Sequence, residues 1–166
     1  MKSTKIKIKK AGIRDLSSFW KLFSQSVRNQ FPHYSEKAKN YFLKKAFSKK
    51  ELQKDLKHRN IIILLALSNR EIAGYLLGLY PYGGVSYVSW IAVKDLFQSK
   101  GIGSRLLKEY EALAKKQGAH KIHLWTDKRN LKFYKKEGYR LVGRIPQNYF
   151  GADDWLFYKT IQKPRY

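Results

Sequence analysis

Residues 93–118, VKDLFQSKGIGSRLLKEYEALAKKQG, place two glycines, Gly101 and Gly103, between an apolar segment and a helical pattern. After the second glycine, apolar side chains recur at positions 106, 107, 110, 113 and 114, the spacing of one helix face. Gly118 comes next, where a left-handed residue commonly ends a helix. The stretch therefore predicts a strand, a glycine turn and a helix that ends before Gly118.

A turn of this kind can bind a phosphate group. The first N–H groups of a helix have no intrahelical partner and carry the positive end of its dipole. Because glycine has no Cβ, the segment from Gln98 to Ser104 is a candidate row of donors, to which Lys100 and Arg105 add charge. A dinucleotide fingerprint would need a third glycine at Leu106, and the nucleotide P-loop motif is absent. The two glycines alone favour a purely architectural turn.

The rest of the chain alternates between strand and helix patterns. Period-two alternation and short apolar runs predict strands at 5–9, 61–67, 72–80, 85–93, 121–125, 139–145 and 155–161. Helical spacing predicts helices at 15–27, from about residue 35, and at 130–137. Ser48 and Glu51 have capping-box spacing and predict a further short helix. The order predicts one α/β or α+β domain over residues 1–166 with a mixed sheet.

The composition is strongly basic, with 35 Lys and Arg against 12 Asp and Glu and a net charge of +23. Such a surface favours polyanions such as nucleic acid, phosphorylated cofactors or acidic membranes, and a merely solubilising lysine surface is the alternative. The absence of cysteine excludes disulfides, thiolate metal sites and a cysteine nucleophile. No His, Asp and Glu set has metal-site spacing. The longest apolar run, residues 61–67, is too short to span a bilayer, so we expect a soluble cytoplasmic protein.

Two motifs resemble those of one enzyme superfamily. The pattern V-x4-Q-x2-G-x-G, which runs from Val93 to Gly103, resembles the acyl-CoA pyrophosphate loop of the GNAT N-acetyltransferases. Downstream, residues 127–139, DKRNLKFYKKEGY, match the superfamily's second motif with Asp127 in place of an asparagine. The order of elements also matches over nearly the whole chain. The resemblance implies a mostly antiparallel sheet of six to seven strands, with splayed central strands and about four flanking helices.

The resemblance also implies acetyl-CoA as co-substrate. The implied acetyl-CoA contacts are Ile91, Ala92, Val93, Gln98, Ser99, Lys100, Gly101, Ile102, Gly103, Ser104, Asp127 and Asn130. A backbone N–H of Val93 or Ala92 is the implied donor to the oxyanion. Tyr134 matches the superfamily's tyrosine, and its phenol is protonated at pH 7, so it is the candidate proton donor to the departing CoA thiolate. A purely packing role for Tyr134 is the alternative.

The general base is less well defined. Many relatives place a glutamate on the strand before the turn, whereas residues 85–93 hold no carboxylate. Tyr87, Ser89 or an ordered water chain are candidates. Asp153 and Asp154 are interpreted first as turn residues of the loop before the last strand, with reach to the site as the alternative. His33 lies in a region that borders the acceptor site in relatives and is interpreted as an exposed loop residue.

The missing base bears on the acceptor. Deprotonation at pH 7 costs about 1 kcal/mol for an α-amine and about 4–5 kcal/mol for a lysine side chain, which favours a peptide N-terminus or an aminoacyl group. The positive surface favours an acceptor with a neutral or anionic body, such as aminoacyl-tRNA or a ribosome-associated protein. Two non-catalytic alternatives are a nucleic-acid-binding module, suggested by lysine–aromatic segments at 39–45 and 132–136, and an acyl-CoA sensor. We expect a monomer or a homodimer.

Overall fold

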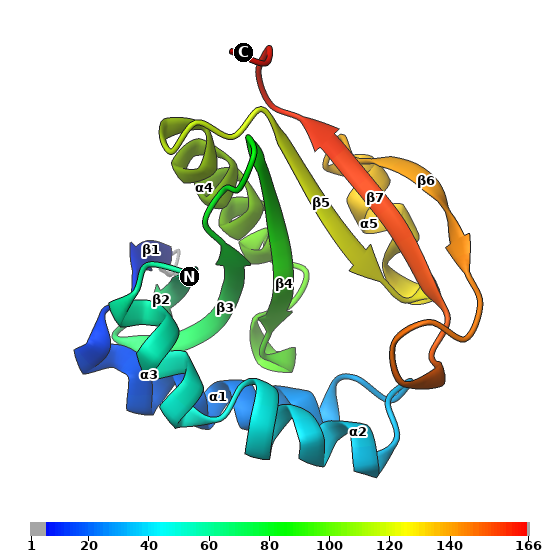
Figure 1. Cartoon of the computed structure of the whole chain (residues 1–166). Coiled ribbons are helices and arrows are strands. Elements are labelled where there is room, and N and C mark those ends of the chain that lie inside the picture. Colours follow the sequence, from blue (N-terminus) through cyan, green and yellow to red (C-terminus); the bar gives the residue numbers. More distant parts are fainter. Residues whose placement is uncertain (1–5, 166) are drawn as a thin grey trace.

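The computed structural model describes residues 6–165, which form one seven-stranded sheet and five α-helices (Figure 1). The strands are β1 (Ile6–Lys10), β2 (Ile61–Ser68), β3 (Glu71–Leu79), β4 (Val85–Val93), β5 (Lys121–Thr126), β6 (Arg140–Ile145) and β7 (Asp154–Thr160). The helices are α1 (Leu16–Asn29), α2 (Glu36–Tyr41), α3 (Lys49–Lys57), α4 (Ile102–Lys116) and α5 (Leu131–Lys136). Every expected element is present, although Lys5, the start of the first expected strand, lies outside the described residues.

The strand order is β1-β2-β3-β4-β5-β7-β6. Only β4 and β5 pair in parallel among the described strands, and all other neighbours are antiparallel. The parallel pair requires a crossover connection, which α4 supplies. The expected mixed, mostly antiparallel sheet is therefore confirmed, with five helices rather than about four. No helix among residues 6–165 has the length and apolarity needed to cross a membrane.

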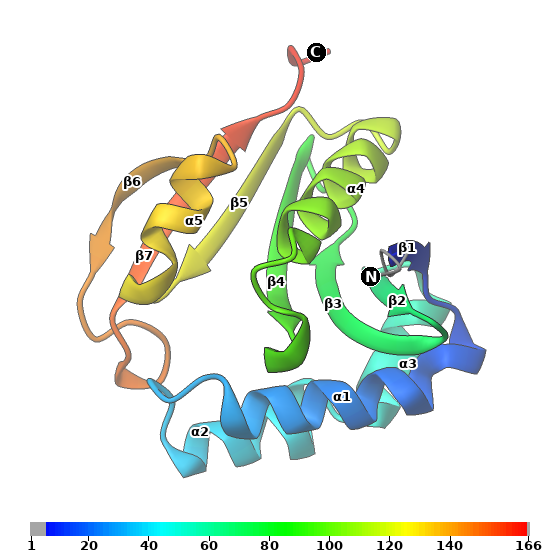
Figure 2. The ribbon, with the colours of Figure 1, turned by 180° about the vertical axis from the view of Figure 1, so that it is seen from behind.

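Two apolar cores cover opposite faces of the sheet. Helix α4 buries one stripe of side chains against the first face, together with Tyr134 of α5: Ile102, Leu106, Leu107, Tyr110 and Ala114. The second face is covered by α1, α3 and the segment after α2, which pack around Tyr75 and Trp90. Figure 2 shows α4 and α5 on one side of the sheet, while α1 and α2 run past the end of β4 where it separates from β5. The middle strands are thus buried on both faces, which explains their unbroken apolar runs.

The two lysine–aromatic segments largely serve the core. Lys39 is only 7% exposed, and its Nζ donates hydrogen bonds to the Arg28 carbonyl and the Glu36 carboxylate, each at 3.0 Å. Phe42 and Tyr134 are also buried, whereas Tyr41 is exposed. Bases stack on exposed aromatic faces. The segments therefore offer little of the stacking surface that the nucleic-acid alternative requires.

Candidate active site

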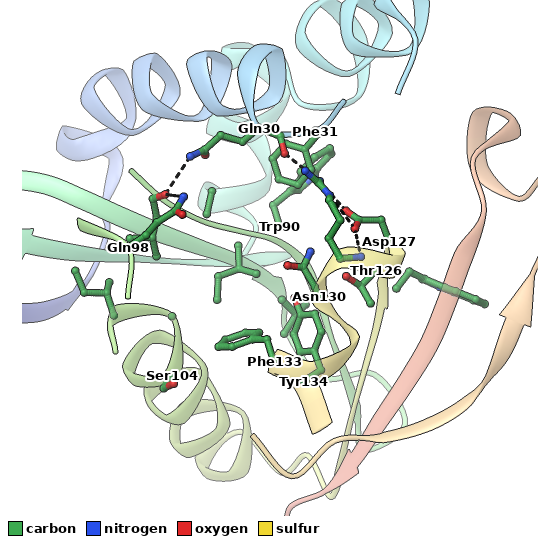
Figure 3. Close-up of a pocket in the computed structure, with 18 of the residues that line it drawn as sticks. Gln30, Phe31, Trp90, Gln98, Ser104, Thr126, Asp127, Asn130, Phe133 and Tyr134 are labelled. Carbon is green, nitrogen blue, oxygen red and sulfur yellow. Dashed lines mark hydrogen bonds and ion pairs between the residues drawn. The ribbon is translucent and has the colours of Figure 1, made fainter. Parts of the chain in front are cut away.

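A gap opens where β4 and β5 diverge. The two strands are paired from Val85 and Lys121 only as far as Val88 and Leu124. Beyond this point β4 stays with β3 to Val93, while β5 stays with β7. The space between them is a cleft of about 790 Å³, and side chains from both strands, α4 and α5 converge on it (Figure 3). The splay of the central strands is thereby confirmed.

The cleft brings together almost all of the residues expected from the sequence. Those that line it are Ile91, Ala92, Val93, Gln98, Ser99, Gly101, Ile102, Gly103, Ser104, Asp127, Asn130 and Tyr134. Lys100 is not among the lining residues. Its ammonium group donates to the Leu96 carbonyl at 3.1 Å and lies 5.4 Å from the centre of the Phe97 ring. Lys100 therefore folds back onto its own loop.

The backbone of β4 presents alternate residues to the cleft. The Lys94 N–H, directly after β4, donates to the Ala73 carbonyl of β3 at 2.9 Å. Because hydrogen-bonded and non-hydrogen-bonded pairs alternate along an antiparallel ladder, Ala92 bonds to β3 and Val93 faces away from it. The Val93 carbonyl accordingly accepts hydrogen bonds from the Gln30 and Gln98 side chains at 3.0 and 3.1 Å. Of the two expected oxyanion donors, the Val93 N–H is the one on the cleft side.

The glycine turn has a separate requirement at each glycine. Gly101 precedes the first residue of α4 with φ +73°, a left-handed conformation that residues with a Cβ adopt at a cost. A Cβ on Gly103 would lie 3.2 Å from Cζ of Phe133, so this position needs a small residue where α4 meets α5. No side chain caps the helix, and its first N–H groups remain available to an anion. The turn can thus hold a phosphate group as well as pack.

The side chains of the turn are engaged in fixing its shape. The Gln98 amide donates to the Asp95 carboxylate at 2.9 Å as well as to Val93. The Ser104 hydroxyl group donates to the Glu137 carboxylate at 2.5 Å, which ties the first turn of α4 to the end of α5. Main-chain N–H groups, rather than these side chains, are therefore the anion donors that the turn offers.

Gln30, directly after α1, is a site residue that the sequence did not indicate. Its amide donates to the Val93 carbonyl at 3.0 Å and to the Asp95 carboxylate at 2.9 Å. Gln30 and Gln98 thus hold the same two acceptors at the end of β4, and Figure 3 shows them approaching from opposite sides. A lone glutamine at a helix end has no motif, so only the fold reveals this contact.

Tyr134 projects from α5 into the cleft, as expected. It is only 4% exposed, and its hydroxyl group interacts with the Thr126 side chain at the end of β5. Burial raises the pKa of Tyr134 well above its usual value, and the nearby Asp127 carboxylate raises it further. The phenol is therefore protonated at neutral pH and is a hydrogen-bond donor.

Asp127 caps the short turn before α5 and carries an ion pair. Its carboxylate accepts from the Arg129 backbone N–H at 2.7 Å and from the Arg129 guanidinium at 2.8 and 3.1 Å. Burial alone would raise its pKa, but these hydrogen bonds and the Arg129 charge outweigh it, so the pKa is lowered. The negative charge of Asp127, at the position where the superfamily motif has an asparagine, is therefore neutralised by Arg129.

His33 is half-buried rather than exposed, so its interpretation as an exposed loop residue is wrong. Its Nδ1 atom lies 3.3 Å from the Asp127 carboxylate, and the side chain lines the cleft. Burial lowers the pKa of His33, and the attraction of Asp127 only partly offsets this. The imidazole is therefore neutral at pH 7. The path of the α1–α2 connection places His33 in the cleft, and the local sequence does not reveal this path.

The two aspartates before the last strand differ sharply. Asp153 is at the surface, where it accepts from the Arg144 guanidinium and from the Gln147 N–H, as a turn residue does. Asp154 is the first residue of β7 rather than a loop residue, is 2% exposed and lines the cleft. Its carboxylate accepts from the Asn148 amide at 3.1 Å. The turn-residue interpretation thus holds for Asp153 and is wrong for Asp154.

Tyr87 as a general base and a grouped set of metal ligands were the other chemical features to locate in the structure. Burial raises the pKa of Tyr87 well above its usual value, so its phenol is protonated at pH 7 and is a poor proton acceptor. Within residues 6–165, no three His, Asp or Glu side chains are grouped to hold a metal ion.

Comparison with solved structures identifies the fold. A solved structure of the PaiA N-acetyltransferase from Thermoplasma acidophilum, in complex with coenzyme A, superposes with a TM-score of 0.79. The two share 22% identity, and the match covers 94% of this chain and 99% of that one. An aminoglycoside 6'-N-acetyltransferase complexed with coenzyme A superposes with a TM-score of 0.72 at 20% identity, covering 96% and 99% of the two chains. At these identities the likeness establishes the fold.

The sequence comparisons add the family. A curated relative, the chloroplastic GCN5-related N-acetyltransferase 4 of Arabidopsis thaliana, is 45% identical over 67 residues. That match spans 39% of this chain and 23% of the relative's length. Residues 18–139 match the Acetyltransferase (GNAT) family. This match is well over half of the chain and includes most of α1, the splayed strands, the glycine turn and Tyr134. This chain therefore belongs to the GNAT acetyltransferase family.

Proposed function

We propose that this chain is an N-acetyltransferase that moves the acetyl group of acetyl-CoA to a primary amine by direct attack within a ternary complex. One observation carries the proposal. A single cleft contains the glycine turn before α4, the outward-facing backbone of Val93 and the buried hydroxyl group of Tyr134. An anion site, an oxyanion donor and a proton donor are the three groups that acyl transfer from a thioester to an amine requires.

Acetyl-CoA fits the cleft as a long, partly anionic ligand. The main-chain N–H groups from Ser99 to Ser104 suit the pyrophosphate, because they lead into the first turn of α4, which no side chain caps. The cleft-side backbone of Ile91 suits an amide group of the pantetheine arm, because Ile91 lies between two residues that bond to β3, and the Val93 N–H remains for the thioester carbonyl. Asn130 and Asp127 border the same space from the turn before α5.

The chemistry then follows from the groups around the thioester. The neutral amine attacks the carbonyl carbon, and the Val93 N–H stabilises the negative charge that develops on the carbonyl oxygen. The C–S bond breaks, and Tyr134 supplies a proton to the leaving thiolate. A peptide or protein α-amine, or an aminoacyl group, is the favoured acceptor, because little energy is needed to deprotonate it at pH 7. The positive surface, with a net charge of +23, supports an acceptor with a neutral or anionic body, including an aminoacyl-RNA.

The first test is the melting temperature with and without acetyl-CoA. Ligand at 100 times its Kd adds about 2.7 kcal/mol, a rise of roughly 5–10 °C for a chain of this size. The rise should persist at moderate salt and exceed that caused by ADP, because nonspecific attraction of a polyphosphate to a basic surface is screened. Thiol release should then follow when a panel of amines is added. No rise at moderate salt would contradict the proposal, and a rise without acetyl transfer to any amine would favour an acyl-CoA sensor.

Replacing Gln30 with alanine tests whether the end of β4 must be held. The Val93 carbonyl and the Asp95 carboxylate would each lose one hydrogen bond but keep the one from Gln98. A hydrogen bond of this kind contributes about 0.5–1.5 kcal/mol, so we expect kcat/KM to fall by about 3–10-fold. Gln25→Ala, at an exposed position on α1, is the control and should retain wild-type values. Equal kinetics for the two variants would remove Gln30 from the site.

A further inference from the structure

A second carboxylate, that of Asp154, lines the same cleft as Asp127 but has no ion-pair partner among the described residues. The last registered pair of β5 and β7 joins Thr126 to Trp155, so the next residues outward, Asp127 and Asp154, follow from the two strands toward the same end of the sheet. The Asp127 carboxylate raises the pKa of Asp154, and both carboxylates raise the pKa of Tyr34. Asp127 is paired with Arg129, whereas none of the ion pairs among the described residues includes Asp154.

Strand alternation places Asp154 across the sheet from Tyr134. On β7, Phe157 lies in the core beneath α4 and α5, where Tyr134 also lies. Side chains alternate along a strand, so Asp154 and Leu156 point to the opposite face. That face is the one on which α1 and the α1–α2 connection lie. The gap between β4 and β5 joins the two faces, because residues from both line one cleft.

Asp154 is buried without a cation. It is 2% exposed, and its hydrogen bonds come from two neutral groups, the Asn148 amide at 3.1 Å and the Tyr149 backbone N–H. Burying a carboxylate is costly unless a positive charge pairs with it. In a chain with a net charge of +23, a cleft-lining carboxylate that no lysine, arginine or histidine of residues 6–165 pairs with is suited to a cation from outside.

We infer that Asp154 receives the ammonium group of the acceptor and takes one of its protons before the amine attacks. This inference deepens the proposed function and rests on it. The acceptor class is a primary amine that is an ammonium ion in solution. The aromatic side chains of Tyr34, Trp90 and Trp125 line the same cleft, and aromatic rings attract such cations. An α-amine belongs to this class, and so does an alkylamine of higher pKa, which a base makes accessible.

The proton balance closes with the groups named. An N–H bond of the ammonium ion breaks and its proton passes to the Asp154 carboxylate, which leaves a neutral amine. The amine nitrogen bonds to the thioester carbon, the C–S bond breaks, and the thiolate takes the Tyr134 proton. The nitrogen then loses its second proton, which restores the phenol, and Asp154 releases its proton to solvent. The sum is one amide, one free thiol and one proton.

The surroundings of Asp154 make its carboxylate a stronger proton acceptor than that of a solvent-exposed aspartate. Burial raises the pKa of Asp154, and the Asp127 and Asp153 carboxylates raise it further, although hydrogen bonds from Asn148 and Tyr149 oppose this. The titratable groups that interact with Asp154 from the surrounding elements are Tyr34, Tyr87, Asp127 and Asp153, and Tyr149 contributes its backbone N–H. Beyond these, the charged Arg129 and the neutral His33 pair with Asp127. Burial raises the pKa values of Tyr34 and Tyr87, so these phenols are neutral at pH 7 and the carboxylates set the local field.

The wild-type pH profile of kcat/KM tests the inference directly. If Asp154 accepts the proton, ammonium ion and carboxylate are the reacting forms, and kcat/KM stays flat from the pKa of Asp154 up to that of the amine. If no base acts, only the neutral amine reacts, and kcat/KM rises tenfold per pH unit below the amine pKa. Acceptors should include a peptide α-amine and a lysine side chain, because their pKa values differ by about 2–3 units.

The matched variants are Asp154→Asn and Asp153→Asn. We expect Asp154→Asn to lower kcat/KM at pH 7 by at least about 100-fold for the lysine acceptor and to convert the flat profile into a tenfold rise per pH unit. Asp153→Asn should keep the flat profile and change kcat/KM by no more than a few-fold, because Asp153 is an exposed turn residue that acts on Asp154 only through its charge. The acetyl-CoA melting shift should survive in both variants, which separates loss of the base from loss of the fold.

Each outcome decides between the two proposals. A wild-type slope of one, or wild-type kinetics in Asp154→Asn, overturns the role of Asp154 and leaves the acetyltransferase intact. If Asp154→Asn fails to fold, the wild-type profile decides alone. If the wild-type protein transfers acetyl groups to no amine in the panel, the proposed function fails and this inference fails with it.

Discussion

Replacing Tyr134 with phenylalanine is expected to lower kcat for acetyl transfer by about 10²–10³-fold, the usual worth of a positioned proton donor. The substitution keeps the ring, which is packed among Phe133, Tyr139 and Phe157, and removes only the hydroxyl group. The departing thiolate would then lose its proposed proton donor. The acetyl-CoA melting shift should remain close to that of the wild type, because the turn before α4 is untouched.

Tyr139→Phe is the matched control. Tyr139 is also buried and lies 5.9 Å from Tyr134 between ring centres, but it does not line the cleft. Removal of its hydroxyl group should change stability slightly and leave kcat near the wild-type value. Steady-state rates measured with saturating acetyl-CoA compare the two variants directly. If Tyr134→Phe turns over like Tyr139→Phe at every pH, Tyr134 is a packing residue and the thiolate obtains its proton elsewhere.

Local patterns in the sequence predicted the elements and one wall of the cleft. The strand Ile61–Ser68 shows an apolar run because it is buried on both faces, and α4 shows an apolar stripe because one of its faces packs on the sheet. The glycine turn and Tyr134 each belong to a short contiguous motif. Such motifs can be recognised in a sequence because main-chain geometry and packing fix the spacing of their residues.

The other wall of the cleft depends on contacts between distant segments. His33 meets Asp127 across 94 positions of sequence, and Gln30 meets the end of β4 across more than 60. From the sequence, Asp154 is interpreted as a turn residue because it precedes the expected last strand. Its pairing with Ile145 of β6 makes it the first residue of β7, and this places it in the cleft. None of these contacts has a local pattern, since each depends on how the sheet places separate loops.

Gly101→Ala is expected to weaken acetyl-CoA binding by about 10–100-fold, the equivalent of one or two charge-assisted hydrogen bonds. Gly101 holds φ +73° directly before α4, and a residue with a Cβ is strained there. Relief of that strain would turn the N–H groups of Ile102 and Gly103 away from a common anion. Titration of each variant with acetyl-CoA measures the effect.

Gly118→Ala separates this effect from lost stability. Gly118 follows the other end of α4 with φ +90°, and a Cβ at either glycine would have no atom within 4 Å. The two substitutions therefore carry the same kind of backbone strain, and each should lower the free energy of unfolding by about 1–2 kcal/mol. Only Gly101 lies at the end of α4 that borders the cleft, so only its variant should lose affinity. Equal affinities in the two variants would mean that the glycine turn ends a strand and begins a helix without holding the pyrophosphate.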